Sequence, residues 1–540
     1  MRKWSCARKA SWSIGMTESE LPVIVVGGGP VGLLTALGLR HYGVPVRVFE
    51  AGAGPTTMTK AGTILPRTLE IMRRYGAVNN IVGAAIRVEE IGEIKRSTGE
   101  LTLSLRTALV DAETRFPFFA NLPQHQLEPL LTETLTCQAR TQVISYDHKL
   151  LEYRQDADGV VATFQTEAGM VEVRGAYLLA CDGGRSTVRA HMGVEVEGTS
   201  LDLRYTLIDL DLDLDVANPQ DYPYLTYFSD PKEWMILVRQ PHGWRFIFPA
   251  AQDAPQPTPE DLKARVVQFI GNVDKAVILE SANYRVHHRV ATSWRDGRVF
   301  LMGDAAHLLT PMWALGLNTG ATDAHNLPWR LAWVHKGLAP ESLLDGYEQE
   351  QKTIAVKGAG EMAEAARHLM DAKGDATDVM SGSDWANVYT RSLLGMRLDV
   401  NGTGSWSMAC TELAPACVGE RLPDFRLQGP DGKPMRAHDL IDGNFLALHF
   451  CDARRRLDMP ADDGERLRHF AVSRWDIPAS DPLRARMLLD IGDAFRTRLG
   501  VGDGSVVLVR PDDHIVLICC EGTFRDEAAK AMPARPLQKD

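Results

Sequence analysis

The stretch LPVIVVGGGPVGLLTALGLRHYGVPVRVFE (Leu21–Glu50) decides the fold of this chain. Its β-branched run PVIVV predicts a short strand that is buried on both faces. GGGPVG predicts a tight turn, and LLTALGLRHYG predicts a helix that ends at Gly43. VPVRVFE predicts a second strand whose last residue is Glu50. The order strand, turn, helix, strand is typical of nucleotide-binding α/β folds.

The turn carries Gly27, Gly29 and Gly32 at the spacing GxGxxG. Gly27 permits the tight turn, Gly29 lets a phosphate approach the backbone, and Gly32 lets helix and strand pack closely. The helix that begins at Pro30 offers free N–H groups and roughly half a positive charge to a pyrophosphate. Glu50 stands where a carboxylate binds ribose hydroxyls. The alternative is a plain glycine turn, which the strand, the helix and the distal Glu50 together disfavour.

A second GxGxxA pattern, at Gly358–Ala363, lies within helical sequence and follows no strand, so we do not interpret it as a nucleotide site. If the chain uses NAD(P)H, the nicotinamide therefore has no dinucleotide domain of its own.

Two later segments also follow short apolar strands. DGGRSTVR (Asp182–Arg189) reads as a glycine turn and a helix start, with helix capping by Asp and Ser as the alternative. In RVFLMGDAAHLLTPMWALGLNTG, Asp304 follows a buried strand and is placed to bind sugar hydroxyls. Gly316, Leu317 and Asn318 would offer backbone N–H groups at a second helix start.

In this order, the motifs resemble those of the class A FAD-dependent aromatic hydroxylases, the para-hydroxybenzoate and phenol hydroxylase group, over about residues 21–350. The resemblance implies that the glycine turn holds the ADP half of FAD. It implies that Asp182 and Gly183 serve both FAD and NADPH, and that Asp304 contacts the ribityl chain.

The resemblance also assigns residues around the flavin ring. It places Gln124 of LPQHQLE at the flavin and the neighbourhood of Pro311 against the ring. The amides of Gly316, Leu317 and Asn318 would meet the N1/O2 edge, where a helix N-terminus favours negative charge by about 0.3–2 kcal/mol. Pro311 and Gly316 are thus the expected catalytic positions.

The chain departs from the family pattern at two places. Lys60 stands where the family often has Arg. The Lys ammonium is a point charge, whereas the Arg guanidinium would bind the cofactor through two parallel hydrogen bonds. The family's PPxGxxG becomes TPMWALG, so Met312 and Trp313 become candidate substrate contacts. Trp313 either reshapes the substrate pocket or packs in the core, and both remain open.

Residues 200–290 predict the antiparallel sheet that binds the substrate. LIDLDLDLDV alternates strictly, so Asp209 to Asp215 are expected to share a solvated face. A buried Arg in this sheet would grip a phenolate or a carboxylate, whereas Arg more often lies at the surface. The candidate substrate residues of the sheet are Tyr224, Tyr227, Trp234, Arg239 and Arg245.

The C-terminal part resembles the thioredoxin-like domain of phenol hydroxylase relatives, through RLPDFRL and VLVRPDDHIV. The position of a redox motif reads CDAR (Cys451–Arg454) and lacks a second cysteine. We therefore expect a packing or dimer role and no thiol–disulfide activity.

The predicted fold class is α/β: a Rossmann-type FAD-binding domain interleaved with an antiparallel-sheet substrate domain, plus a C-terminal thioredoxin-like α/β domain. The expected boundaries are a disordered extension over 1–20, the FAD-binding domain over 21–199 and 291–396, the substrate sheet over 200–290, a linker over 397–417 and the thioredoxin-like domain over 418–540.

The composition limits the partners. The formal net charge of −11, without a basic block, argues against nucleic acid. The eight cysteines form no metal or disulfide pattern, which favours a reducing, cytoplasmic compartment, and no metal site is assigned. No apolar stretch is long and unbroken enough to span a bilayer, so no membrane partner is expected. A homodimer is possible.

These observations predict an FAD-dependent monooxygenase that uses NAD(P)H and O2 to hydroxylate a small phenolic substrate through the flavin C4a-hydroperoxide. Baeyer–Villiger oxidation or epoxidation of a polycyclic or polyketide substrate on the same scaffold is the enzymatic alternative. A flavin-bound protein that sequesters a ligand without catalysis is the alternative of another class.

Overall fold

The computed structural model describes most of the chain between residues 21 and 536. The predicted extension (1–20), Pro311, Met312, Trp313 and most of the predicted linker lie outside the described residues. The described ranges are 21–60, 62–139, 142–214, 222–230, 233–271, 273–309, 314–360, 394–400, 415–452, 457, 459–478 and 480–536.

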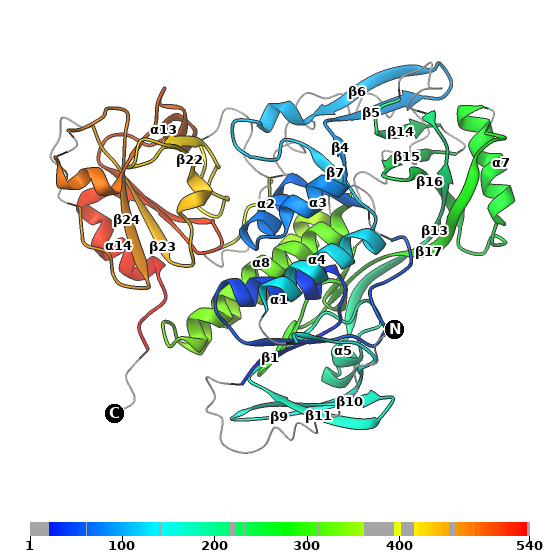
Figure 1. The fold of residues 1–540 in the computed structure, drawn as a ribbon, viewed down its shortest axis with the longest axis horizontal. Helices are drawn as coiled ribbons and strands as arrows, with labels where there is room; N and C mark the ends of the chain where they lie inside the picture. Colours follow the sequence, from blue (N-terminus) through cyan, green and yellow to red (C-terminus); the bar gives the residue numbers. More distant parts are fainter. Residues whose placement is uncertain are drawn as a thin grey trace, which may run out of the picture.

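A six-stranded sheet forms the centre of the FAD-binding part (Figure 1). The helices α1, α4 and α8 pack together beside β1, where α1 contacts both of the others. The strand order is β18 (Arg295–Asp296), β19 (Val299–Leu301), β12 (Leu178–Ala180), β1 (Val23–Val26), β2 (Val46–Phe49) and β8 (Ile144–Ser145), and the helices are α1 (Pro30–His41), α4 (Gln124–Gln138) and α8 (Leu315–His335).

The three sequence motifs follow adjacent parallel strands of this sheet. Val26, Ala180 and Leu301 lie in register at the carboxyl ends of β1, β12 and β19. The glycine turn, the DGGRSTVR segment and Asp304 therefore leave the sheet at the same edge. Ligands of open α/β sheets bind at this edge, so the topology alone brings the predicted cofactor residues together.

A three-stranded antiparallel sheet lies on the side of β1 opposite to the helices, at the bottom of Figure 1. Phe49 of β2 and Phe164 stack across this junction, with ring centroids 4.4 Å apart. The strands are β9 (Lys149–Asp156), β10 (Gly159–Thr166) and β11 (Gly169–Gly175), and the helix α5 (Thr187–Met192) packs against β9.

The substrate sheet has eight strands, and α7 (Pro259–Ile270) covers its outer face (Figure 1). Its other face meets the FAD-binding part. The order is β20 (His307–Leu308), β17 (Val277–Ala291), β13 (Val196–Asp211), β16 (Gly243–Ala251), β15 (Met235–Gln240), β14 (Leu225–Ser229), β5 (Glu90–Lys95) and β6 (Glu100–Arg106). The central strands β14, β15 and β16 carry apolar residues that pack on both sides of the sheet.

The expected solvated aspartate face of β13 is wrong at its first position. The Asp209 side chain is only 13% exposed and forms an ion pair with Arg245, which is buried as well. β13 ends at Asp211, which is exposed, and Asp215 lies outside the described residues. Strict alternation fixes which residues share a face, but it does not say that the polar face meets solvent.

Shorter elements connect the two main sheets. A small antiparallel sheet joins three strands in the order β3, β7, β4. These elements are β3 (Thr63–Ile64), α2 (Pro66–Arg74), α3 (Val78–Ala84), β4 (Ile86–Val88), β7 (Phe119–Asn121) and α9 (Asp345–Thr353).

The C-terminal domain is a separate α/β unit with its own core and a seven-stranded mixed sheet, at the left of Figure 1. The α/β fold class and the mixed C-terminal sheet agree with the sequence prediction. Its elements are β21 (Arg426–Gln428), β22 (Pro434–Arg436), β23 (Phe445–Phe450), β24 (Leu467–Ser473), β25 (Met487–Leu489), α13 (Ala494–Leu499), β26 (Ser505–Val509), β27 (Ile515–Cys520) and α14 (Phe524–Ala531). Among the helices of the described residues, none combines the length and the apolar character that a membrane crossing needs.

Buried ion pairs join the C-terminal domain to the FAD-binding part. The Asp513 carboxylate contacts Arg67 at 2.5 Å and Arg74 at 2.9 Å, both from α2. Arg510 donates to Glu350 of α9 at 2.7 and 2.9 Å. All five side chains are at most 7% exposed. We call this set the ionic seam.

Candidate active site

The glycine turn accepts no side chain at two of its positions. Gly27 has φ +107°, and a Cβ there would lie 2.2 Å from the Cys181 carbonyl oxygen. A Cβ on Gly32 would lie 2.1 Å from the Gly27 oxygen. Helix α1 begins after Gly29 without a side-chain cap among the described residues. Its first N–H groups are therefore available to an anion, as a pyrophosphate requires.

The Glu50 carboxylate lies directly beside the glycine turn. One oxygen accepts from the Gly28 N–H at 2.6 Å, and the other accepts from the Gly52 N–H at 2.8 Å. On the other side of the turn, Gln124 donates to Glu128 at 2.7 Å. Glu128 also accepts from the Thr56 N–H at 2.6 Å. Glu128 is buried, and the sequence analysis did not identify it.

Asp182 holds the second motif in place and keeps one oxygen unpaired. Its Oδ2 accepts from the N–H groups of Thr187 at 2.7 Å and Val188 at 3.2 Å. Its Oδ1 is buried and has no hydrogen-bond partner within the described structure. Burial raises the pKa of this carboxyl. A buried unpaired acceptor is costly, and the hydroxyl of a bound cofactor would satisfy it.

Arg189 connects the second motif to the third. Its guanidinium donates to the carbonyl oxygens of Ala305 at 2.8 Å and Gly184 at 2.7 Å. The alternative interpretation, that Asp182 and Ser186 cap a helix, is confirmed, since Ser186 accepts from the Arg189 N–H at 2.9 Å. Capping leaves Oδ1 of Asp182 without a partner in the described structure.

Asp304 lies in the short turn after β19, where Gly303 has φ +55°. The residue keeps exposed surface, but the protein atoms around its carboxyl displace water, and this desolvation raises the pKa of the carboxyl. The nearby His307 and Lys60 oppose that shift. Asp304 and Lys60, which lie far apart in the sequence, are therefore close enough for their charges to interact.

His307 and Asp323 form a buried pair behind the Asp304 turn. Nε2 of His307 lies 2.8 Å from Oδ2 of Asp323, and that oxygen also accepts from the Gly303 N–H at 2.8 Å. Burial disfavours the imidazolium, but the Asp323 carboxylate outweighs this and raises the pKa of His307. Asp323 belongs to α8, so the pair holds the turn on that helix.

The first two turns of α8 lie against the turn that carries Asp304. Ala314 precedes the helix in the left-handed region, with φ 58° and ψ 28°, and α8 has no side-chain cap in the described structure. A Cβ on Gly316 would meet nothing within 4 Å. The Asn318 side chain instead accepts from the Leu65 N–H at 2.9 Å and from the Thr68 hydroxyl at 2.7 Å. Its backbone amide and that of Leu317 remain candidates for a ligand.

Tyr227 and Trp234 belong to an apolar cluster between the substrate sheet and α8. Both are 4% exposed, and Leu315 of α8 is part of the same cluster. Tyr205 packs edge-on against Trp234, with ring centroids 5.2 Å apart. We call this packed cluster the aromatic lining, after its four buried aromatic members Phe119, Tyr205, Tyr227 and Trp234. Its other buried members are Leu65, Val88, Ile91, Leu105, Leu225, Ile236, Val238 and Leu315.

Tyr224 and Arg239 lie on the opposite face of the sheet. The Tyr224 ring packs edge-on against Trp244, with centroids 5.7 Å apart, and the Arg239 guanidinium lies over the same ring. Trp244 belongs to the outer cluster, together with Leu262 of α7. The structure therefore does not bring these two predicted substrate residues together with Tyr227 and Trp234.

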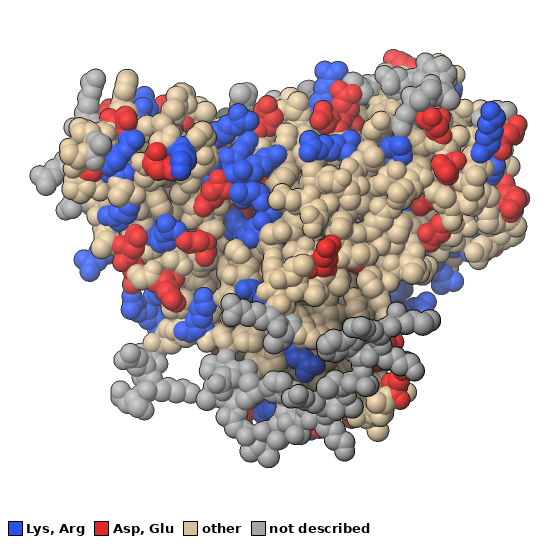
Figure 2. All heavy atoms as spheres, in the orientation of Figure 1, with Lys and Arg blue, Asp and Glu red and all other residues tan. Residues whose placement is uncertain are grey.

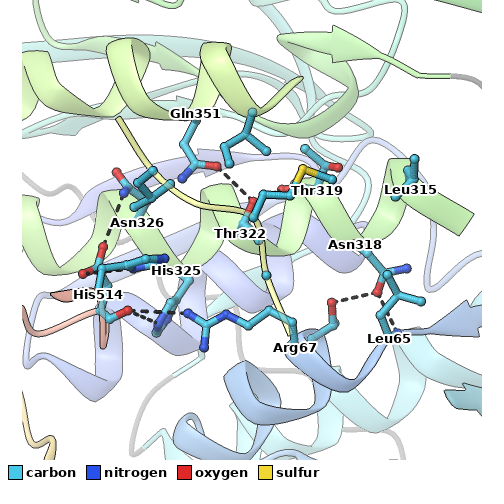
Figure 3. Close-up of a pocket in the computed structure, with 16 residues that line it drawn as sticks. Leu65, Arg67, Leu315, Asn318, Thr319, Thr322, His325, Asn326, Gln351 and His514 are labelled. Carbon is cyan, nitrogen blue, oxygen red and sulfur yellow. Dashed lines mark hydrogen bonds and ion pairs between the residues drawn. The ribbon is translucent and has the colours of Figure 1, made fainter. Parts of the chain in front are cut away.

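A small cavity lies beside the first turns of α8 (Figure 3). It has about 50 Å³ of free space and is mainly apolar. Leu65, Leu315 and Asn318 line one end, and His514 of the C-terminal domain lies at the other end. The C-terminal domain thus forms part of the wall behind the candidate active site.

A second hollow lies between α2 and the C-terminal domain, where Figure 2 shows Lys and Arg side chains gathered. It has about 340 Å³ of free space and includes Arg73 and Arg115, both of which pair with Asp439. Glu70, Asp424 and His438 lie close enough to share a metal ion. Because Arg67 and Arg421 already neutralise the Glu70 carboxylate, the cluster is a poor fit for a cation.

Comparison with known proteins assigns the fold to a family. The FAD binding domain family matches residues 20–359. Para-nitrophenol 4-monooxygenase of Pseudomonas sp. (strain WBC-3) is 31% identical over 339 residues, covering 62% of this chain and 83% of the relative. Tetracenomycin B2 monooxygenase-dioxygenase of Streptomyces olivaceus is 29% identical over 547 residues, covering 93% and 95%.

A solved structure extends the likeness to the C-terminal domain. The anhydrotetracycline hydroxylase OxyS of Streptomyces rimosus superposes with a TM-score of 0.73 at 26% identity, covering 95% of this chain and all of that one. The glycine turn, the unpaired Asp182 oxygen and the open helix N-termini fit the pyrophosphate, the sugar hydroxyls and the anionic flavin edge of FAD. The chain belongs to the FAD-binding flavoprotein monooxygenases and is an FAD-dependent aromatic hydroxylase.

Proposed function

We propose that this enzyme hydroxylates a phenol with an extended ring system, with NAD(P)H as the reductant. The observation that carries the proposal is the aromatic lining, which joins the substrate sheet to the start of α8. Bulky aromatic walls favour a large, flat apolar substrate. The relative that covers nearly the whole chain is named for tetracenomycin B2, and the p-nitrophenol relative covers 62% of this chain.

The cofactor roles are part of this proposal. The turn with Gly27, Gly29, Pro30 and Gly32 binds the pyrophosphate, and Glu50 binds the adenosine ribose. Support comes from the steric limits at Gly27 and Gly32 and from the place of Glu50 beside the turn. The remaining proposed cofactor residues are Lys60, Gln124, Asp182, Gly183, Asp304, Gly316, Leu317 and Asn318.

Bound FAD supplies the oxygen chemistry, and the protein orients the substrate and excludes water. The first turn of α8 directs its N–H groups at the edge of the flavin site, where negative charge is favoured. Tyr227 and Trp234 hold the ring of the substrate against this site. Pro311, Met312 and Trp313 complete the site in this proposal, on the basis of the family motif.

The test is NAD(P)H oxidation by the FAD-loaded enzyme over a panel of simple and polycyclic phenols, with mass analysis of the products. We expect polycyclic phenols to accelerate oxidation most and to gain one oxygen atom without ring opening. A product in which the ring has opened would favour Baeyer–Villiger oxidation. If NAD(P)H reduces the bound flavin with none of the ligands, the result would favour a flavin-bound protein that sequesters a ligand without catalysis.

We also propose a cytoplasmic location. Six cysteines are described, and all are free thiols, of which Cys137 and Cys520 are exposed. Exposed unpaired thiols are typical of proteins in reducing compartments. Thiol titration of protein isolated under non-reducing conditions tests the proposal, and disulfides between these cysteines would contradict it.

A further inference from the structure

Arg245 is the buried cation on the side of the substrate sheet that faces the flavin. Val238, which pairs with Arg245 on the neighbouring strand, belongs to the aromatic lining. Ile247, two residues further along the same strand as Arg245, packs against this lining. The side chain is 4% exposed. By position alone, it is the residue that would bind a carboxylate or phenolate on the substrate.

Protein acceptors already occupy this guanidinium. Nε and Nη2 each lie 2.9 Å from an oxygen of Asp209, in a bidentate pair. Nη1 donates to the Lys60 carbonyl oxygen at 2.6 Å, and Nη2 also contacts the Thr59 hydroxyl. Asp209 cancels the charge, and the four contacts together use four of the five N–H groups of the guanidinium.

The same contacts fasten the loop that precedes β3. Besides its hydroxyl contact with Arg245, Thr59 donates its backbone N–H to the Glu280 carboxylate of β17 at 3.0 and 3.2 Å. The next residue is Lys60, whose charge acts on Asp304. The substrate sheet therefore fixes the backbone of the loop that carries a proposed cofactor residue.

We propose that Arg245 is a positioning residue for the Thr59–Lys60 loop and that its neutralisation by Asp209 makes the pocket select uncharged aromatic substrates over carboxylate-bearing ones. The immediate surroundings support this, since Val238 and Ile247 beside Arg245 are apolar. A carboxylate placed there would lose its hydration without gaining an unpaired cation, which is costly. The selectivity part rests on the proposed function, and the positioning part does not.

The first experiment compares two probes that differ only by a carboxylate, 1-naphthol and 1-hydroxy-2-naphthoate. We measure the stimulation of NADPH oxidation by the FAD-loaded enzyme with each probe. The expected kcat/KM is at least tenfold higher for 1-naphthol. Equal or better use of the naphthoate would overturn the selectivity.

Asp209→Asn gives the sharper test, because it keeps the shape and one acceptor while it releases the Arg245 charge. We expect the ratio of naphthoate to naphthol kcat/KM to rise about tenfold. The double variant Asp209→Asn/Arg245→Gln should restore the original ratio. A purely structural role for the pair would lower both rates and leave the ratio unchanged, which would overturn the proposal. Asp211→Asn is the matched control on the exposed part of the same strand.

The positioning part has its own readout in the apoprotein. Arg245→Met should weaken FAD binding, measured by quenching of FAD fluorescence, by at least tenfold. Unchanged FAD affinity in a folded variant would overturn it. If neither probe nor any other phenol stimulates the FAD-loaded enzyme, the proposed function and the selectivity fail together, whereas the FAD titration still decides the role of Arg245.

Discussion

Nε2 of His307 lies 2.8 Å from Oδ2 of Asp323, and neither side chain has any exposed surface. His307 follows the turn that carries Asp304, whereas Asp323 lies within α8, whose first turn faces the proposed flavin edge. Gly320 and Gly303 are also in close contact, since a Cβ on Gly320 would lie 3.4 Å from the Gly303 Cα. The pair therefore holds the Asp304 turn against α8, and so fixes the distance between two parts of the proposed cofactor site.

Asp323→Ala should weaken FAD binding and destabilise the fold. It leaves His307 and the Gly303 N–H without a buried acceptor, which costs about 3–5 kcal/mol when the pair is ionic. Asp323→Asn keeps an acceptor and should lose less. FAD titration and urea unfolding of the apoprotein measure both effects. Equal FAD affinities for Asp323→Ala and the wild type would contradict the role of the pair.

Asp304→Ala should give folded protein with little bound FAD. In the proposed site, the carboxylate accepts hydrogen bonds from the ribityl hydroxyl groups of FAD. Removing one such hydrogen bond to a charged group costs about 1.5–3 kcal/mol. The ratio of flavin to protein absorbance after purification measures the loss. Asp296→Ala, an exposed change at the other end of the neighbouring strand β18, is the control. A fully flavin-loaded Asp304→Ala protein would remove the ribityl assignment.

Asp513→Ala should destabilise the junction of the two parts of the chain. Its carboxylate faces Arg67, Arg74 and His325, and the loss of one partner from a buried pair costs about 3–5 kcal/mol. Lys530→Ala, which breaks an exposed pair with Glu527, should cost at most about 1 kcal/mol. Urea unfolding of both variants tests the difference, and similar midpoints would be inconsistent with the ionic seam.

Acid should loosen the same junction. Burial lowers the pKa of His325 to about 4, with help from Arg67 and Arg74 and against the pull of Asp513. An unfolded histidine titrates near 6.5. Between about pH 6.5 and 4, the unfolded chain binds a proton that the folded chain does not, so stability falls as pH falls, by up to about 1.4 kcal/mol per pH unit. His325→Gln should flatten this slope in pH-dependent urea unfolding, and an unchanged slope would contradict the assignment.

Cys451→Ala should leave NADPH oxidation unchanged. The thiol is 2% exposed, and burial raises its pKa to about 11, so it stays protonated at neutral pH. A protonated, shielded thiol is a poor nucleophile. A loss of turnover above tenfold in a folded variant would restore a thiol role for the C-terminal domain.

The sequence predicts the cofactor edge well because each motif follows a strand, and parallel neighbours end together. It predicts the substrate face less well. Tyr224 and Tyr227 are close in sequence, yet they lie on opposite faces of a sheet that is apolar on both sides. Periodicity separates two faces, but only packing against α7 or α8 identifies the inner one.

Buried polar partners are the residues that sequence reasoning missed. Glu128 and Asp323 sit in helices, where a single acidic residue among apolar neighbours gives only a weak signal. The Asp209–Arg245 pair and the ionic seam join residues that are far apart along the chain. Patterns of local spacing carry no information on such pairs, because the first depends on which strands pair in the sheet and the second on how two domains dock.

The ionic seam has a consequence for exchanging domains between relatives. Asp513 of the C-terminal domain meets Arg67 and Arg74 on α2, and Arg510 meets Glu350 on α9. A chimaera that imports only residues 418–536 from another hydroxylase would bury charges opposite foreign side chains. An exchange of the C-terminal domain between relatives therefore has to include its partner residues on α2 and α9.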